Sequence, residues 1–109
     1  MDLWKEVNLI CGNLELAIKE LKQRGKVYSQ TEHDYRVLLS KRLTELRAEG
    51  QAVTHLADIA KGEPEVAKLR LQRDIAESLY KSCQEAINVY KVKIRVLEGQ
   101  MQREWTKRE

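Results

Sequence analysis

Residues 64–105 read PEVAKLRLQRDIAESLYKSCQEAINVYKVKIRVLEGQMQREW, and they carry the strongest structural signal in the chain. Steps of three and four residues alternate here without interruption, and ten of the twelve positions reached are apolar or aromatic. These positions are Val66, Leu69, Arg73, Ala76, Tyr80, Cys83, Ile87, Tyr90, Ile94, Leu97, Met101 and Glu104. Heptads sustained over this length are typical of a helix that packs in a coiled coil. Pro64 suits a first helical position, which needs no amide hydrogen. The stretch predicts a helix over about residues 64–106.

A less regular pattern of the same kind occupies the first fifty residues. It comprises Leu3, Val7, Ile10, Leu14, Ala17 and Leu21, resumes at Tyr28, Thr31, Tyr35 and Leu38, and then moves to Leu39, Leu43 and Leu46. Gly25 lies between the two parts, and a glycine inside a helix costs about 1 kcal/mol relative to alanine. Because the pattern resumes in phase, we expect one helix over about residues 2–49, and the sequence leaves open whether Gly25 interrupts it. Gly50 suits the position just past a helix C-terminus.

Residues 50–62, GQAVTHLADIAKG, connect the two helices. Thr54 could cap a short helix that ends at Gly62, which predicts a helix over about residues 53–61. Short connections join antiparallel neighbours. The predicted fold is therefore all-α: a single domain, residues 1–109, built as a long antiparallel helical hairpin (a coiled coil) with a short helix at the bend.

This hairpin predicts which residues face each other. If the bend is centred near residue 57, residue i lies opposite about residue 114 − i in an antiparallel pair of equal rise. Arg42 then comes close to the level of Arg73, and Glu45 and Asp74 could neutralise the two arginines. The register is thus a specific expectation that a structure can test.

The same register places the tryptophans and cysteines. Trp4 would lie beside Trp105 and close the open end of the hairpin. Cys11 and Cys83 would lie about 30 Å apart, whereas a disulfide needs Cα atoms within about 7 Å. We therefore expect two free thiols, as is usual in a reducing compartment.

A second apolar stripe on the later helix predicts self-association. Five of seven positions at helical spacing, Ile75, Leu79, Ala86, Val89 and Val96, are apolar, and the first helix adds Leu9, Leu16, Ile18 and Val37 outside its main seam. One partner helix cannot cover faces this wide, and small scaffolds with little core commonly oligomerise. We expect a homodimer in which two hairpins form a four-helix bundle.

Residues that could support catalysis or hold a metal do not form a recognisable motif. His33 and His55 each lack a second ligand at metal-binding spacing. The sequence contains no nucleophile elbow, phosphate-binding glycine loop or dinucleotide fingerprint. We expect no enzymatic activity, no metal, no cofactor and no small-molecule substrate. No apolar run approaches the roughly 18 residues of a membrane span, so we expect no membrane partner either.

The charge balance is only weakly basic, with 20 Lys and Arg against 17 Asp and Glu. The basic residues are densest near the C-terminal end, where Lys91, Lys93, Arg95, Arg103, Lys107 and Arg108 are candidate nucleic-acid contacts. A solvated helix face with cations near its C-terminus is the simpler interpretation. A helix-turn-helix over residues 54–73 is disfavoured, because Glu63 and Glu65 lie where base contacts are normally made.

Several segments resemble small uncharacterised proteins of temperate phages and prophages of Gram-positive bacteria. The resemblance rests on residues 55–62 (HLADIAKG), 65–70 (EVAKLR) and 86–88 (AIN), with residues 3–7 (LWKEV) and 103–105 (REW) near the two ends. It implies a location in the host cytoplasm and an accessory role in phage DNA metabolism. It supplies no functional residues to transfer.

These observations predict a non-enzymatic coiled-coil accessory protein of phage DNA replication or recombination. It would act by binding a protein partner, by binding nucleic acid through its basic end, or by both. Two alternatives stay open: a phage-encoded inhibitor of a host enzyme, and a component of virion assembly or scaffolding.

Overall fold

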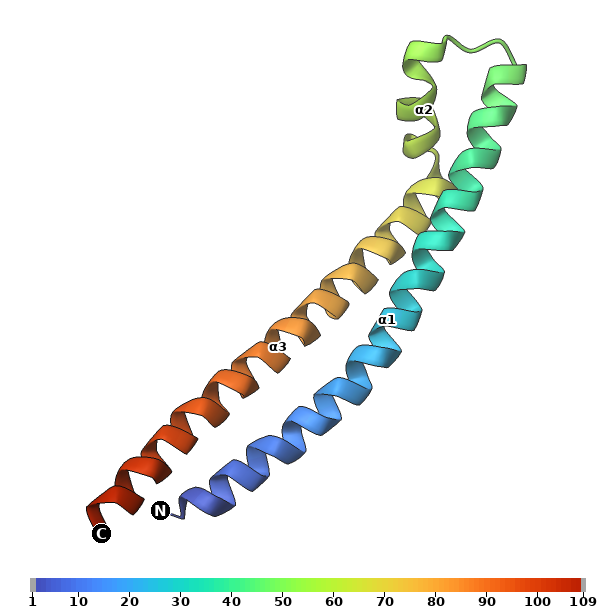
Figure 1. Ribbon diagram of the computed structural model, residues 1–109. Coiled ribbons are helices and arrows are strands. Elements are labelled where there is room, and N and C mark those ends of the chain that lie inside the picture. Colours follow the sequence, from blue (N-terminus) through green and yellow to red (C-terminus); the bar gives the residue numbers. More distant parts are fainter. Residues whose placement is uncertain (1, 109) are drawn as a thin grey trace. The chain divides into compact units, whose positions relative to one another are not determined.

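The computed structural model describes residues 2–108, and every regular element in this range is helical. Helix α1 spans Leu3–Ala48, the 3₁₀ turn η1 spans Val53–His55, α2 spans Leu56–Gly62 and α3 spans Pro64–Arg108 (Figure 1). The two long helices were predicted to within two residues at each end. Gly25 lies inside α1 and does not interrupt it. The contacts divide the chain into two compact units: a first unit of residues 2–23 and 80–108, and a second unit, Arg24–Leu79.

Local hydrogen bonds explain where α1 begins and ends. The Asp2 carboxylate accepts hydrogen bonds from the backbone N–H groups of Trp4 and Lys5, at 3.0 and 3.3 Å, and so caps the first turn. At the other end, Gly50 has a φ of +85°, the left-handed conformation that glycine adopts readily. The N–H of Gln51 bonds the carbonyl of Leu46, which completes a Schellman motif.

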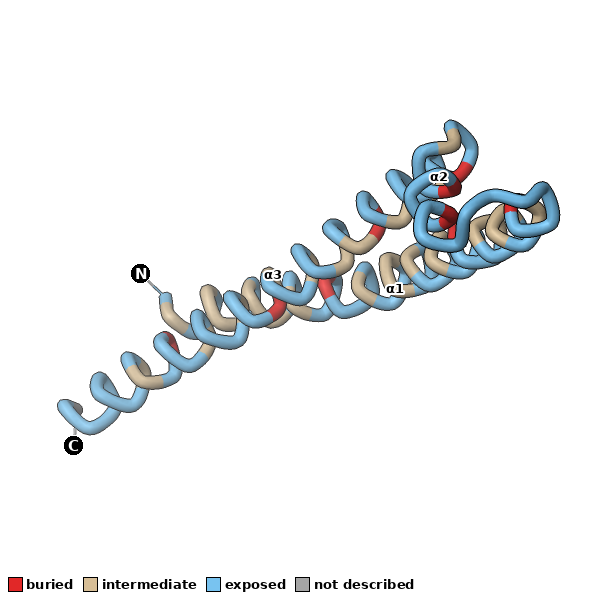
Figure 2. Tube along the Cα trace, turned by 90° about the horizontal axis from the view of Figure 1, so that it is seen from above, coloured by how far each residue is buried: buried red, intermediate tan, exposed pale blue. Residues whose placement is uncertain are grey.

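Burial along α3 follows the predicted heptad seam. Val66, Ala76, Ile87 and Leu97 are buried. Buried segments, coloured red, recur along α3 in Figure 2. The seam positions between them are half-buried, and Glu104 alone among the twelve is exposed. On α1 the buried positions Ala17, Tyr35 and Leu46 also lie where the apolar pattern places them. The 3–4 alternation therefore identified the packed face of both long helices.

In the second unit, the short helix α2 packs against the C-terminal part of α1. Leu56 and Ala60 of α2 form a buried cluster with Leu46, and Leu39 and Leu43 border it. The predicted cap at Thr54 is wrong, because neither η1 nor α2 has a side-chain cap. The helix is instead held by the apolar contacts of one face.

This packing corrects the predicted register. Arg42 pairs with Glu63, and Glu32 pairs with Arg73, so the residue numbers of facing pairs sum to 105 rather than about 114. Arg42 is therefore not level with Arg73. The reason is that α2 runs antiparallel to α1 and packs beside its last turns. Because α2 occupies that level, α3 begins further back along α1 than a simple bend would place it.

The first unit shows a similar offset. The Cys83 thiol donates a hydrogen bond to the Ala17 carbonyl at 3.3 Å, a pair whose numbers sum to 100. Trp4 therefore faces a position near residue 96, and Trp105 lies beyond it. Both tryptophans are 62% exposed, so the predicted closure by their contact is wrong. Cys11 lies six residues from Ala17, an axial distance of about 9 Å rather than 30 Å.

Candidate interaction site

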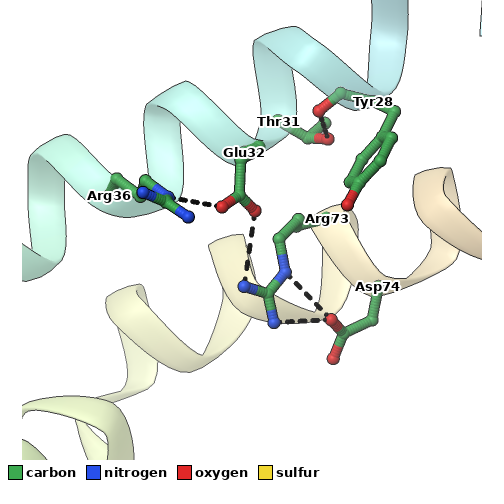
Figure 3. A network of polar contacts seen from close by, with 6 residues as sticks. All are labelled: Tyr28, Thr31, Glu32, Arg36, Arg73 and Asp74. Carbon is green, nitrogen blue, oxygen red and sulfur yellow. Dashed lines mark hydrogen bonds and ion pairs between the residues drawn. The ribbon is translucent and has the colours of Figure 1, made fainter. Parts of the chain in front are cut away.

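A polar network joins α1 to α3 in the second unit (Figure 3). Arg73 donates to Asp74 from Nε and Nη2, at 3.0 and 2.8 Å, and its Nη1 lies 3.4 Å from Glu32. Its guanidinium also lies 4.6 Å from the ring centroid of Tyr35, a cation–π contact. Arg36 donates to Glu32, and this bond together with the charges of the two arginines lowers the pKa of Glu32. The network gives Arg73, a charged residue on the apolar seam, two carboxylate partners and one aromatic contact.

A second arginine holds the beginning of α3. Arg42 donates to both carboxylate oxygens of Glu63, from Nε at 2.8 Å and from Nη2 at 2.6 Å, and also bonds Glu45. Hydrogen bonding to Arg42 lowers the pKa of Glu63, and the same bonds raise the pKa of Arg42. Glu63 has extended backbone, as the residue before a proline prefers. Glu45 and Asp74 are neutralising partners as predicted, but Glu63 and Glu32 were missed.

These two networks favour a structural role. Each of the carboxylates Glu32 and Glu63 is held in its charged form by an arginine, whereas a general acid or base needs a pKa near the working pH. The arginine pairs instead fix α3 against α1 at two levels. The exposed apolar residues are therefore the stronger candidates for a functional surface.

The first unit carries an open apolar groove of about 480 Å³ between α1 and α3. Its lining is formed by Leu3, Glu6 and Ile10 from α1 and by Val92, Lys93, Val96, Leu97 and Gln100 from α3. Leu97 belongs to the buried seam, whereas Val92 and Val96 are more than half exposed. The groove is thus an apolar extension of the core that reaches the surface.

Exposed apolar residues continue from the groove along α3. Val89, Val92 and Val96 have the spacing i, i+3, i+7, which places them on one helix face. Their exposed fractions are 44, 52 and 55%. The stripe predicted from the sequence contains Val89 and Val96 but not Val92. The helical spacing of the three valines was the signal that could have identified this face more fully.

The predicted nucleic-acid residues are exposed but do not form one stripe. Lys91, Lys93, Arg95, Arg103 and Lys107 have exposed side chains and form no ion pair with any residue that the structure describes, and the Arg108 side chain lies outside the described part. At about 100° per residue, Lys91 and Arg95 share one face. Lys93, Arg103 and Lys107 lie on another face, roughly a third to a half of a turn away. The structure does not bring these cations together on a single surface.

The cysteines and the possible metal ligands among the described residues do not form a further site. Cys11 and Cys83 are both half-buried free thiols. Among residues 2–108, no three His, Cys, Asp or Glu residues lie together in a way that could hold a metal ion. Within the same range, no helix combines the length and the apolar character needed to span a membrane.

Comparison of the chain with protein-family models, with curated proteins and with solved structures finds no significant match.

Proposed function

We propose that the chain is a non-enzymatic helical accessory protein of phage DNA replication or recombination, which acts as a homodimer and binds a protein partner in the host cytoplasm. One observation carries the interaction part of this proposal: large apolar side chains stay exposed on both long helices outside the seam. Exposed apolar surface of this kind marks sites of protein association. The phage context is supported by the sequence resemblance described above.

The exposed set is distributed over both units. In the first unit it includes Leu9, Leu16, Val89, Val92 and Val96. In the second unit it includes Val37, Leu71, Ile75 and Leu79. Since a helix uses one face for its neighbour, residues on the other faces are available to further helices. A homodimer can cover one part of this surface and leave another for a different protein.

The partner can be tested by co-purification during phage growth. A tagged chain would be expressed from its own locus in a lysogen and recovered after induction, with Ile75→Glu as an exposed-face variant and Lys68→Glu as a matched control. We expect a replication or recombination protein to be recovered at a fixed ratio with the parent chain and with Lys68→Glu, and to be lost with Ile75→Glu. Recovery of a host enzyme would support the inhibitor alternative, and presence of the chain in purified virions would support an assembly role.

Nucleic-acid binding is a second candidate function, favoured by the exposed cations near the C-terminal end that form no ion pairs within the described residues. Gel-shift titrations with single-stranded and double-stranded DNA would test it. Phosphate contacts predict affinity that falls steeply as salt rises, because bound counterions are released. Charge removal at Arg103 and Lys107 should then reduce the salt dependence. The absence of a shift at low salt would leave protein binding alone.

A further inference from the structure

We infer that an open cleft in the second unit binds a phosphate monoester with an apolar body, such as a nucleoside monophosphate. We call it the cationic cleft and define it by Arg36, Ser40, Lys61 and Arg73, which all line it. Its volume of about 430 Å³ lies within the range of small-ligand sites. The inference goes beyond the proposed function, which rests on exposed apolar residues, so either can fail without the other.

Three cations from three helices line the cationic cleft: Arg36 from α1, Lys61 from α2 and Arg73 from α3. The one carboxylate in the described lining is Glu32, which Figure 3 shows between the two guanidinium groups. The lining thus has an excess of two positive charges, and the excess stays positive when Asp74, which bonds Arg73 from outside the cleft, is counted. A phosphate monoester carries about −1.5 to −2 at pH 7 and balances this excess better than a single carboxylate does.

Hydrogen-bond donors also remain at the cationic cleft. Among the described residues, Arg36 donates to Glu32 from Nε alone, so its two Nη groups can bind a ligand. The Lys61 ammonium and the Ser40 hydroxyl have no hydrogen bond or ion pair with any residue that the structure describes. A phosphate offers three strong acceptor oxygens, and a guanidinium can bind two of them side by side. The cleft can therefore supply a donor from each of these side chains to one phosphate.

The same face of α1 supplies an apolar surface beside these donors. Arg36, Leu39, Ser40 and Leu43 have the spacing i, i+3, i+4, i+7, which places them on one helix face. Leu39 and Leu43 are half-buried and line the cleft. The apolar body of a ligand can lie against them while its phosphate reaches Arg36 and Ser40. We therefore expect an organic phosphate to bind more tightly than inorganic phosphate.

A neighbouring cleft of the same unit has the opposite charge balance. Its volume is about 470 Å³, and its lining sets Lys41 and Arg42 against Glu45, Glu63 and Glu65. Arg42 is already bonded to Glu63 and Glu45. An anion is thus expected at the cationic cleft and not here, which makes Lys41 a matched control position.

Calorimetric titration of the full chain with dAMP tests the cationic cleft. Lys61→Met should weaken binding by about tenfold, since it removes a charge-assisted hydrogen bond. Lys41→Met removes the same charge from the neighbouring cleft and should bind as the parent chain does. Both lysines are exposed, so both variants should keep the helical circular dichroism of the parent chain. A parent chain that does not bind dAMP, or equal affinity of the two variants, would overturn the inference.

Backbone amide NMR locates the ligand without a substitution. Addition of dAMP should shift the amides of residues 36–43 and of Lys61, whereas deoxyadenosine, which lacks the phosphate, should not. Shifts confined to other residues would overturn the inference.

Competition then identifies the source of the phosphate. Displacement of dAMP by an oligonucleotide with a 5′-phosphate, but not by its 5′-hydroxyl counterpart, would support a site for DNA strand ends. Displacement by neither would support a site for free nucleotides. Equal displacement by both would show that phosphodiesters suffice, and would overturn the assignment to a monoester.

Discussion

Arg42 binds Glu63 through two nitrogens, and this pair connects α1 to the residue immediately before α3. The paired atoms lie 2.6–2.8 Å apart, and both side chains are about one-quarter exposed. Together with the Glu32–Arg73 pair, it fixes the antiparallel register of the second unit. The two pairs make stability in this unit sensitive to pH.

We expect the free energy of unfolding to fall as the solution is acidified. The pKa values of Glu32 and Glu63 are lowered in the folded chain, so their contribution is fully present above the ordinary glutamate value of 4.5. It is lost as the pH falls through the lower folded values, where both carboxylates become protonated. Urea unfolding between pH 7 and pH 2.5, followed by circular dichroism, measures this loss. The Glu32→Gln/Glu63→Gln variant should show a shallower dependence, and an unchanged slope would contradict the assignment.

Two glycines should respond in opposite ways to the same substitution. Gly50→Ala should destabilise the chain by about 1–2 kcal/mol, since an alanine disfavours a positive φ. Gly12→Ala should stabilise it by up to about 1 kcal/mol, since Gly12 lies inside α1 and nothing surrounds the added Cβ within 4 Å. Chemical unfolding of both variants gives the two values. Stabilisation by Gly50→Ala would show that this Schellman ending of α1 is wrong.

The packing of α2 on α1 should depend on one leucine. Leu56→Ala removes a buried side chain from the cluster with Leu46 and Ala60, and should cost about 2–5 kcal/mol. Val53→Ala, at an exposed position three residues earlier, should change stability by no more than about 0.5 kcal/mol. Hydrogen exchange of the α2 amides would show whether Leu56→Ala releases this helix. Equal effects of both substitutions would argue against the packed face.

Arg73 should not tolerate replacement by lysine. A lysine keeps the charge but loses the two hydrogen bonds that Nε and Nη2 donate to Oδ1 of Asp74, and the planar contact with the Tyr35 ring. Because Arg73 is still one-fifth exposed, we expect a loss of about 1 kcal/mol or less. Arg70→Lys, at an exposed position on the same helix, is the control and should be neutral. Arg73→Lys with the stability of the parent chain would show that the guanidinium geometry is unimportant.

The sequence predicted the helices well because their signals are local. Apolar spacing identified the buried faces of α1 and α3, and Gly50 and Pro64 marked where α1 stops and α3 starts. Ion-pair partners that lie close in sequence, such as Glu45 for Arg42 and Asp74 for Arg73, were also predicted.

Contacts between distant residues were harder to predict, because they depend on the register. The predicted register treated residues 50–62 as a simple bend, whereas Leu56 and Ala60 draw α2 back along α1. That error shifted every long-range pair, which is why Glu63 was missed as the partner of Arg42. The groove of the first unit was missed for the same reason, since it needs Leu3 and Ile10 to lie opposite Val96 and Leu97.

Sedimentation equilibrium of the parent chain over a range of concentrations is the most direct test of whether the exposed apolar faces serve for association. One chain has a mass of 12.7 kDa, and the proposed homodimer predicts twice that value, with dissociation on dilution. A mass of 12.7 kDa at every concentration would contradict the proposal.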